Sequence, residues 1–190
     1  MRELEEKILR EGKVLPGDVL KVGSFLNHQI DVGFAMRMGL EIAGMYSGCS
    51  VTKVLTVETS GIPIAFCAAY ELGVPMVFAK KNRTSNLSGG LYQTTVHSYT
   101  HNTDYTVVVE KQFLSPGDRV LIVDDFLANG KALMGLRDLV LMAGAQVVGA
   151  AVAIEKGFQP GGAELRSLGM RVESLAVIDS LEDGRIVFRG

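Results

Sequence analysis

Short apolar runs alternate along the chain with longer stretches in which apolar residues recur every three or four positions. The short runs are rich in β-branched residues and have the length of buried strands. The longer stretches have the period of amphipathic helices. This alternation predicts an α/β fold with a mostly parallel sheet and helices on both faces. The expected strands are 53–57, 75–79, 119–123, 146–154, 172–178 and 186–188.

Capping residues and glycines mark where the predicted helices begin and end. Leu4, Ile8 and Leu9 share the apolar face of a short N-terminal helix that Gly12 ends. Asp31 can cap the next helix, because its carboxylate can accept hydrogen bonds from free backbone N–H groups. The expected apolar positions of that helix are Phe34, Met38 and Ile42. The other helices should end before Gly73, run between Gly130 and Gly144, and cover about 163–168.

The stretch 80–93 breaks this pattern, because it is polar, contains paired glycines and lacks periodicity. A long irregular segment inside a compact domain is typically a binding loop or a lid. The other expected segments are a hairpin with strands at 94–99 and 105–110 joined through His101 and Asn102, and an extended segment at 19–26.

Composition limits the class of protein without deciding its function. The 190 residues fit a single domain, 1–190, and 47 % hydrophobic residues suffice for a sizeable core. The net charge of -2 and the lack of a basic stripe argue against nucleic acid as a partner. No apolar run is long enough to span a membrane, and the charged N-terminus does not resemble a signal peptide. We therefore expect a cytoplasmic protein in which Cys49 and Cys67 are reduced.

The residues that could bind a ligand or take part in a reaction concentrate in the segment 120–132. An apolar run leads into Asp124 and Asp125, and a loop with Asn129 and Gly130 then opens a helix. Ligands of α/β sheets bind at the carboxyl ends of strands, and a helix N-terminus favours phosphate. The segment could therefore hold the hydroxyl groups and the phosphate of a phosphorylated sugar. Taken alone, paired acids after a strand are equally typical of a solvated turn.

The segment 120–130 resembles the phosphoribosyl-pyrophosphate signature of the type I phosphoribosyltransferases: an apolar run, two acids and a loop of small residues. Together with 24–31 and 154–160 it is similar to the bacterial xanthine phosphoribosyltransferases, and the similarity extends over 4–188. The resemblance implies the type I phosphoribosyltransferase fold, a central, mostly parallel, twisted sheet flanked by helices. It also implies a flexible hood loop at 82–93 and a small base-binding subdomain formed by the termini.

The resemblance implies a site for 5-phosphoribosyl-1-pyrophosphate. Asp124 and Asp125 would be the catalytic acids, bound to the ribose hydroxyls, where negative charge stabilises an oxocarbenium-like transition state. The loop 58–61 would bind pyrophosphate, although taken alone it is more typical of an ordinary turn. The implied contacts are Ala128, Asn129, Gly130, Lys131 and Ala132 at the phosphate, Glu58, Thr59, Ser60 and Gly61 at the pyrophosphate, and Lys80 and Lys81 at the base of the hood loop.

The resemblance also implies four residues for the purine base: Leu20, Asn27, Lys156 and Phe158. The Lys156 ammonium would meet an exocyclic oxygen, and Phe158 would stack on the ring. The Asn27 amide would donate to the 2-oxo group that distinguishes xanthine from hypoxanthine, which disfavours a base without that group. By sequence alone, Asn27 is more typical of a turn residue bonded to the backbone.

The implied reaction uses positioning and charge rather than a protein nucleophile. Mg²⁺ would bind through the diphosphate and the ribose hydroxyls, without a protein cage. The family also implies a homodimer in which the hood and lysine regions lie near the neighbouring subunit. Two alternatives stay open: the same reaction on hypoxanthine, guanine or adenine, and a regulator that binds the activated sugar without reaction. Adenine fits worst, because its amino group would face the Lys156 ammonium.

Overall fold

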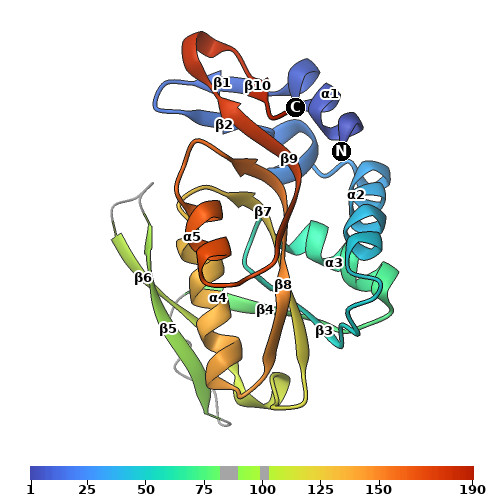
Figure 1. The fold of residues 1–190 in the computed structure, drawn as a ribbon, viewed down its shortest axis with the longest axis vertical. Coiled ribbons are helices and arrows are strands. Elements are labelled where there is room, and N and C mark those ends of the chain that lie inside the picture. Colours follow the sequence, from blue (N-terminus) through green and yellow to red (C-terminus); the bar gives the residue numbers. More distant parts are fainter. Residues whose placement is uncertain (82–89, 99–102) are drawn as a thin grey trace.

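A computed structural model describes residues 1–81, 90–98 and 103–190 of the chain. The strands of its main sheet are β3 (Lys53–Val57), β4 (Met76–Lys81), β5 (Leu91–Ser98), β6 (Thr103–Glu110), β7 (Arg119–Leu127), β8 (Gln146–Lys156), β9 (Val172–Ser180) and β10 (Val187–Phe188). Within the described ranges the sheet has eight strands, in the order β10-β9-β8-β7-β3-β4-β6-β5. The strands from β9 to β4 are parallel, and the edges are antiparallel. The expected mostly parallel sheet is therefore confirmed (Figure 1).

Helices cover both faces of the sheet (Figure 1). They are α1 (Arg2–Glu11), α2 (Val32–Met45), α3 (Ile62–Leu72), α4 (Lys131–Met142) and α5 (Gly161–Ser167). Side chains of α1, α2 and α3 share one apolar core, and those of α4 and α5 share another. A Cβ on Gly39 of α2 would lie 2.6 Å from the Cys67 backbone of α3. The missing side chain therefore lets these two helices approach closely.

Most expected elements form close to where the sequence predicts them. Asp31 caps α2 as expected, because its Oδ1 accepts a hydrogen bond from the Phe34 N–H at 3.1 Å. On α1, Leu4 and Ile8 are fully buried. The expectation for Leu9 was wrong, since it is 58 % exposed and lies outside the buried face.

The expected end of the strand 119–123 at the paired acids was also wrong. β7 continues through Asp124 and Asp125 to Leu127. Its partner β8 is equally long, and Leu127 is in register with Glu155. Pairing with β8 therefore keeps the backbone of the acids extended, and the turn begins only after Leu127.

The segment 19–26 is not extended throughout, contrary to expectation. β2 (Val19–Lys21) pairs with β1 (Lys13–Leu15), and Gly23–Asn27 then forms a turn of π-helix. Phe25 and Leu26 are both fully buried. Neighbouring residues of a strand point to opposite faces, so an extended segment would not bury both in one core.

The expected start of an irregular segment at Lys80 was wrong. Lys80 and Lys81 still belong to β4, because they pair with β6. β5 begins at Leu91, three positions before the expected hairpin strand. The part of the expected hood loop at 82–89, with His101 and Asn102, lies outside the described residues.

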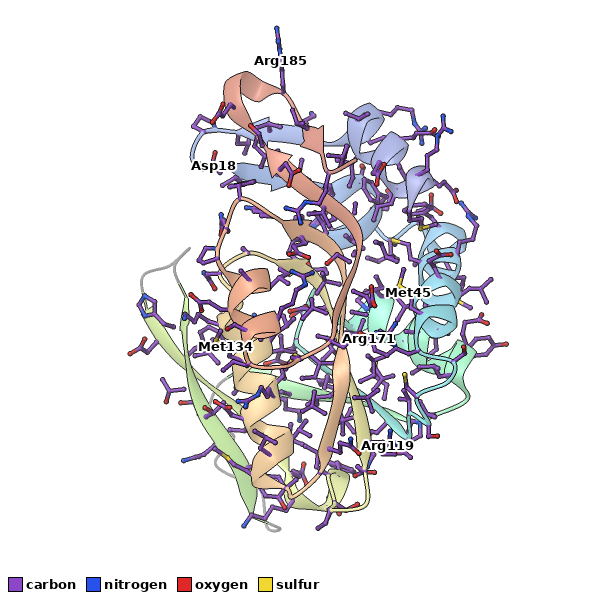
Figure 2. All side chains as sticks on the ribbon, viewed as in Figure 1. Asp18, Met45, Arg119, Met134, Arg171 and Arg185 are labelled. Carbon is purple, nitrogen blue, oxygen red and sulfur yellow. The ribbon has the colours of Figure 1, made fainter. Side chains whose placement is uncertain are left out.

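The two ends of the chain meet at one end of the main sheet (Figure 1). The Met1 amino group donates to the Leu175 carbonyl of β9, and β10 returns antiparallel to β9. The β1–β2 turn, which carries Asp18, lies at the same end (Figure 2). These contacts assemble the expected small subdomain beside the carboxyl end of β8.

Just before β9, Arg171 donates to the Met45 carbonyl of α2 at 2.9 Å (Figure 2). Arg119 donates to the Cys49 carbonyl, also at 2.9 Å. These contacts anchor the connection between α2 and β3. Cys49 and Cys67 are both free. Within the described residues, none of the helices has the length and apolarity needed to cross a membrane.

Candidate functional site

The paired acids lie at the carboxyl end of β7. The Asp124 side chain is buried, with the residue 5 % exposed, and its Oδ1 accepts a hydrogen bond from the Asp125 N–H at 3.0 Å. Burial raises the pKa of Asp124 well above its ordinary value, and the negative charge of Asp125 adds to the effect. The Lys81 ammonium opposes this rise. The pair therefore resists carrying two negative charges at once, and a positive charge placed beside it would favour ionisation of Asp124.

A short loop joins β7 to α4 and exposes the helix N-terminus. Gly130 has φ 77, in the left-handed region that favours glycine, and α4 begins at the next residue, Lys131. The Asn129 side chain accepts a hydrogen bond from the Lys131 N–H at 3.1 Å. Within the described residues, the N–H groups of Asn129, Gly130 and Ala132 have no hydrogen-bond partner, so they can bind an anion, which the helix dipole also favours. The predicted phosphate loop, from Ala128 to Ala132, therefore has the local geometry that it needs.

Gly161 of α5 packs directly against this loop. Its N–H donates to the Ala128 carbonyl at 3.1 Å. A Cβ on Gly161 would lie 2.4 Å from the Gly130 nitrogen, closer than any side chain could approach. The backbone of α5 therefore packs against the phosphate loop and holds it in place.

The loop between β3 and α3 approaches the acids from the neighbouring strand. The peptide bond between Glu58 and Thr59 is cis, a feature that the sequence left undecided. Ser60 follows, and Gly61 brings the backbone against Asp124, since a Cβ on Gly61 would lie 2.5 Å from Asp124 Oδ1. The Glu58 carboxylate accepts a hydrogen bond from the Lys81 N–H. The predicted pyrophosphate loop is thus in contact with both β7 and β4.

The two predicted lysines of β4 lie on opposite faces of the sheet. The Lys81 ammonium lies 5.3 Å from the centre of the Tyr105 ring, and its charge acts on Asp124. Lys80 instead lines a hollow on the other face with Phe78 and Phe113. Alternation along a strand separates them, so only Lys81 faces the acids of its own chain.

Of the four residues predicted for the base, Asn27 contacts an acid directly, Leu20 lies beside Asn27, and Lys156 contacts the β1–β2 turn. The Asn27 amide donates to Asp125 Oδ2 at 2.7 Å. Lys156, at the end of β8, donates to the Asp18 carbonyl at 2.8 Å, and burial lowers the pKa of its ammonium. Leu20 is 6 % exposed and lines a hollow together with Asn27. Phe158 is 38 % exposed, so a ring face remains accessible.

Sequence reasoning missed several residues that shape this site. Asp18 holds Lys156, and Gly161 supports the phosphate loop. The Tyr105 phenol is half-buried near Asp124. Burial raises the pKa of Tyr105, and the charge of Asp124 adds to this rise. The paired glycines at 161–162 were a possible signal, whereas nothing local distinguished the other two.

Comparison with known proteins agrees with this geometry. Residues 40–162 match the family model for the phosphoribosyl transferase domain. A xanthine phosphoribosyltransferase of Bifidobacterium longum is 54 % identical over 192 residues, covering 100 % of both chains. Xanthine phosphoribosyltransferase 1 of Clostridium perfringens is 53 % identical over 190 residues, again covering 100 % of both chains.

Solved structures with a similar fold include adenine phosphoribosyltransferases. The Giardia lamblia enzyme, complexed with 9-deazaadenine, aligns with a TM-score of 0.78 at 23 % identity, covering 92 % of this chain and 96 % of its own. The Rhodothermus marinus enzyme aligns with a TM-score of 0.74 at 23 % identity, covering 94 % and 100 %. At such identity the likeness establishes the type I fold alone. With the family model and the full-length relatives, it follows that the chain belongs to the phosphoribosyltransferase family, in the branch of the bacterial xanthine phosphoribosyltransferases.

Proposed function

We propose that this chain transfers the phosphoribosyl group of 5-phosphoribosyl-1-pyrophosphate to xanthine, giving xanthosine 5′-monophosphate and pyrophosphate. The observation that carries the proposal is the hydrogen bond from Asn27 to Asp125. The reaction joins a base nitrogen to C1′ of the sugar, so the base-binding residues must lie beside those that bind the ribose. Asn27 and Asp125 meet this requirement across the active site.

The chemistry is a displacement at C1′. The bond from C1′ to the pyrophosphate oxygen breaks, a bond to the base nitrogen forms, and the proton of that nitrogen passes to the departing pyrophosphate. Positive charge develops on the ribose, and the carboxylates of Asp124 and Asp125 stabilise it while they bind the 2′- and 3′-hydroxyls. Lys81 and the loop 58–61 bind the departing pyrophosphate.

Mg²⁺ fits this site as a substrate-bound ion. Among the described residues, no three His, Cys, Asp or Glu side chains lie close enough together to hold a metal ion. The diphosphate and ribose hydroxyl oxygens of the substrate are the hard donors that Mg²⁺ prefers. When bound, the ion would neutralise negative charge on the pyrophosphate. The chain contributes indirectly, through the acids that orient the hydroxyls.

Base selection depends on donors that face oxo groups. Lys156 uses one of its three N–H groups on the Asp18 carbonyl, which leaves two for an exocyclic oxygen at C6 of the purine. The Asn27 amide can exchange Asp125 for the 2-oxo group once the hydroxyls occupy that acid. A base with an amino group at C6 would place donor against donor, so adenine should be rejected.

A purine panel tests this assignment. We expect xanthine to give the highest kcat/KM in steady-state assays of pyrophosphate release, followed by guanine and hypoxanthine, with adenine lowest. Lys156→Met keeps most of the apolar stem and should lower kcat/KM for xanthine by about 100-fold, because an oxo group then loses its charged donor. Lys111→Met, an exposed lysine outside the site, should have no such effect. A preference for adenine would contradict the proposal.

A homodimer is part of the proposed function. Phe78 is 39 % and Phe113 is 46 % exposed, and they line one hollow together with Met76 and Lys80. Exposed apolar side chains gathered in one place are typical of protein–protein interfaces. A second copy on this face would bury them and would bring Lys80 to the neighbouring subunit, where a cation can reach the neighbour's pyrophosphate.

Disrupting this face should separate the subunits. We expect Phe78→Glu to be monomeric in multi-angle light scattering at a concentration where the wild type is dimeric, because a buried unpaired carboxylate is costly. Leu40→Glu is the matched control, since Leu40 is 59 % exposed on α2. A wild type that is monomeric at working concentration would contradict the dimer. The expected cytoplasmic location stays a prediction.

A further inference from the structure

One buried polar group beside the acids takes no part in the displacement at C1′. Thr56 of β3 is fully buried. Among the described residues its hydroxyl oxygen, Oγ1, has no hydrogen-bond partner. An unpaired hydroxyl costs folding free energy, whereas the isosteric valine would cost none. A hydroxyl at such a position indicates a role other than stability.

The surroundings of Gly61 show which group this hydroxyl faces. A Cβ on Gly61 would lie 2.3 Å from Thr56 Oγ1 and 2.5 Å from Asp124 Oδ1. Both oxygen atoms therefore border the space that the missing side chain leaves. Any other residue at position 61 would separate them. Within the described residues, Asp124 Oδ1 accepts a hydrogen bond from the Asp125 N–H, and a carboxylate oxygen can accept a second one.

We propose that Thr56 is a positioning residue for Asp124. Its hydroxyl is unpaired within the described part of the structure and donates to the Asp124 carboxylate across Gly61 when the ribose binds, which fixes the orientation in which that carboxylate meets the ribose hydroxyls. The inference rests on the proposed function, because it concerns the same acid in the same reaction. It also gives a reason for glycine at position 61 that is independent of pyrophosphate binding.

Other groups also act on Asp124 and must be separated from Thr56. Asp125 lies beside it on β7, Lys81 faces it from β4, and Tyr105 faces it from β6. Asp125 opposes ionisation of Asp124, and Lys81 favours it. A hydroxyl donor adds to the effect of Lys81, because it stabilises the charged form. Loss of the hydroxyl should therefore make Asp124 harder to ionise without altering any charge.

The test compares Thr56→Val with Thr56→Ser in the assay of pyrophosphate release from xanthine. We expect Thr56→Val to lower kcat by at least about 10-fold, with little change in KM, since a misaligned acid mainly weakens the transition state. The acidic limb of its pH profile should move to higher pH. Thr56→Ser should have the kcat and the pH profile of the wild type. The unfolding temperature of Thr56→Val should equal or exceed that of the wild type.

Two further comparisons separate the effect of the hydroxyl from a general effect on folding. If Thr56→Val fails to fold, the pair Thr56→Ser and Thr56→Ala still isolates the hydroxyl, because both lack the methyl group. Val54→Ala, on the same strand, should lower the unfolding temperature without moving the pH profile. A wild-type kcat and pH profile in the hydroxyl-free variant would overturn the inference alone. A wild type that does not turn over xanthine would overturn the proposed function instead.

Discussion

Replacing both Asp124 and Asp125 by asparagine should lower kcat by about 100- to 1,000-fold while the protein stays folded. The variant keeps the shape of both side chains and removes the negative charge that stabilises the ribose cation. Steady-state pyrophosphate release at saturating substrate measures the loss, and circular dichroism measures folding. Asp138→Asn, on the exposed side of α4, is the matched control and should keep wild-type turnover.

Stability should change in the opposite sense to activity. Burial and the charge of Asp125 raise the pKa of Asp124 in the folded protein. The folded state therefore binds this proton more tightly than the unfolded state, and its contribution to stability is complete below the ordinary pKa of aspartate. That contribution is lost as the pH rises through the raised pKa. At neutral pH the Asp124→Asn variant should be at least as stable as the wild type. Unchanged turnover in the variant with both acids replaced would contradict their catalytic role.

Arg166→Met should cause the largest loss of stability. Arg166 forms two hydrogen bonds of 2.8 Å to the Glu155 carboxylate, and Glu155 is 2 % exposed. Removing the guanidinium leaves a buried charge unpaired, which we expect to cost about 2 kcal/mol. This is less than for a fully buried pair, because the Arg166 side chain is 41 % exposed. Urea unfolding at neutral pH measures the difference, and a change below about 0.5 kcal/mol would contradict it.

The pH dependence identifies the pair as the cause. Burial raises the pKa of Glu155, but the hydrogen bonds of Arg166 and Ser174 outweigh burial and lower it. Wild-type stabilisation from this group is therefore present above the ordinary pKa of glutamate and lost as the pH falls through the lowered value. The difference in free energy of unfolding between the wild type and Arg166→Met should become smaller in acid. Arg137→Met, which breaks a more exposed pair, should show neither effect.

Arg166→Met should also weaken substrate binding. Arg166 holds α5 to β8, and Gly161 at the start of α5 supports the phosphate loop. We therefore expect KM for the activated sugar to rise in Arg166→Met with a smaller change in kcat, because the loop amides lose their alignment in ground state and transition state alike.

Local pattern in the sequence determined the elements and the chemistry of one segment. Apolar runs and helical periodicity predict the strands and helices, because burial on one or both faces leaves a period that a single segment displays. The order of the residues from Asp124 to Gly130 predicts acids followed by a phosphate-binding turn, since both features are contiguous. Even there, the sequence placed the end of β7 too early, because pairing with β8 rather than local preference keeps the acids extended.

Only the tertiary structure decided how the site is assembled. Asn27 and Asp125 are 98 positions apart, and Lys156 and Asp18 are 138 apart, so neither contact leaves a local signal. Sheet order places β4 near the acids, and alternation along that strand points Lys81 toward them and Lys80 away. The approach of Gly61 to Thr56 and Asp124 likewise depends on packing between β3, β7 and α3. Contacts of this kind arise from the shape of the whole core, which no short stretch of sequence contains.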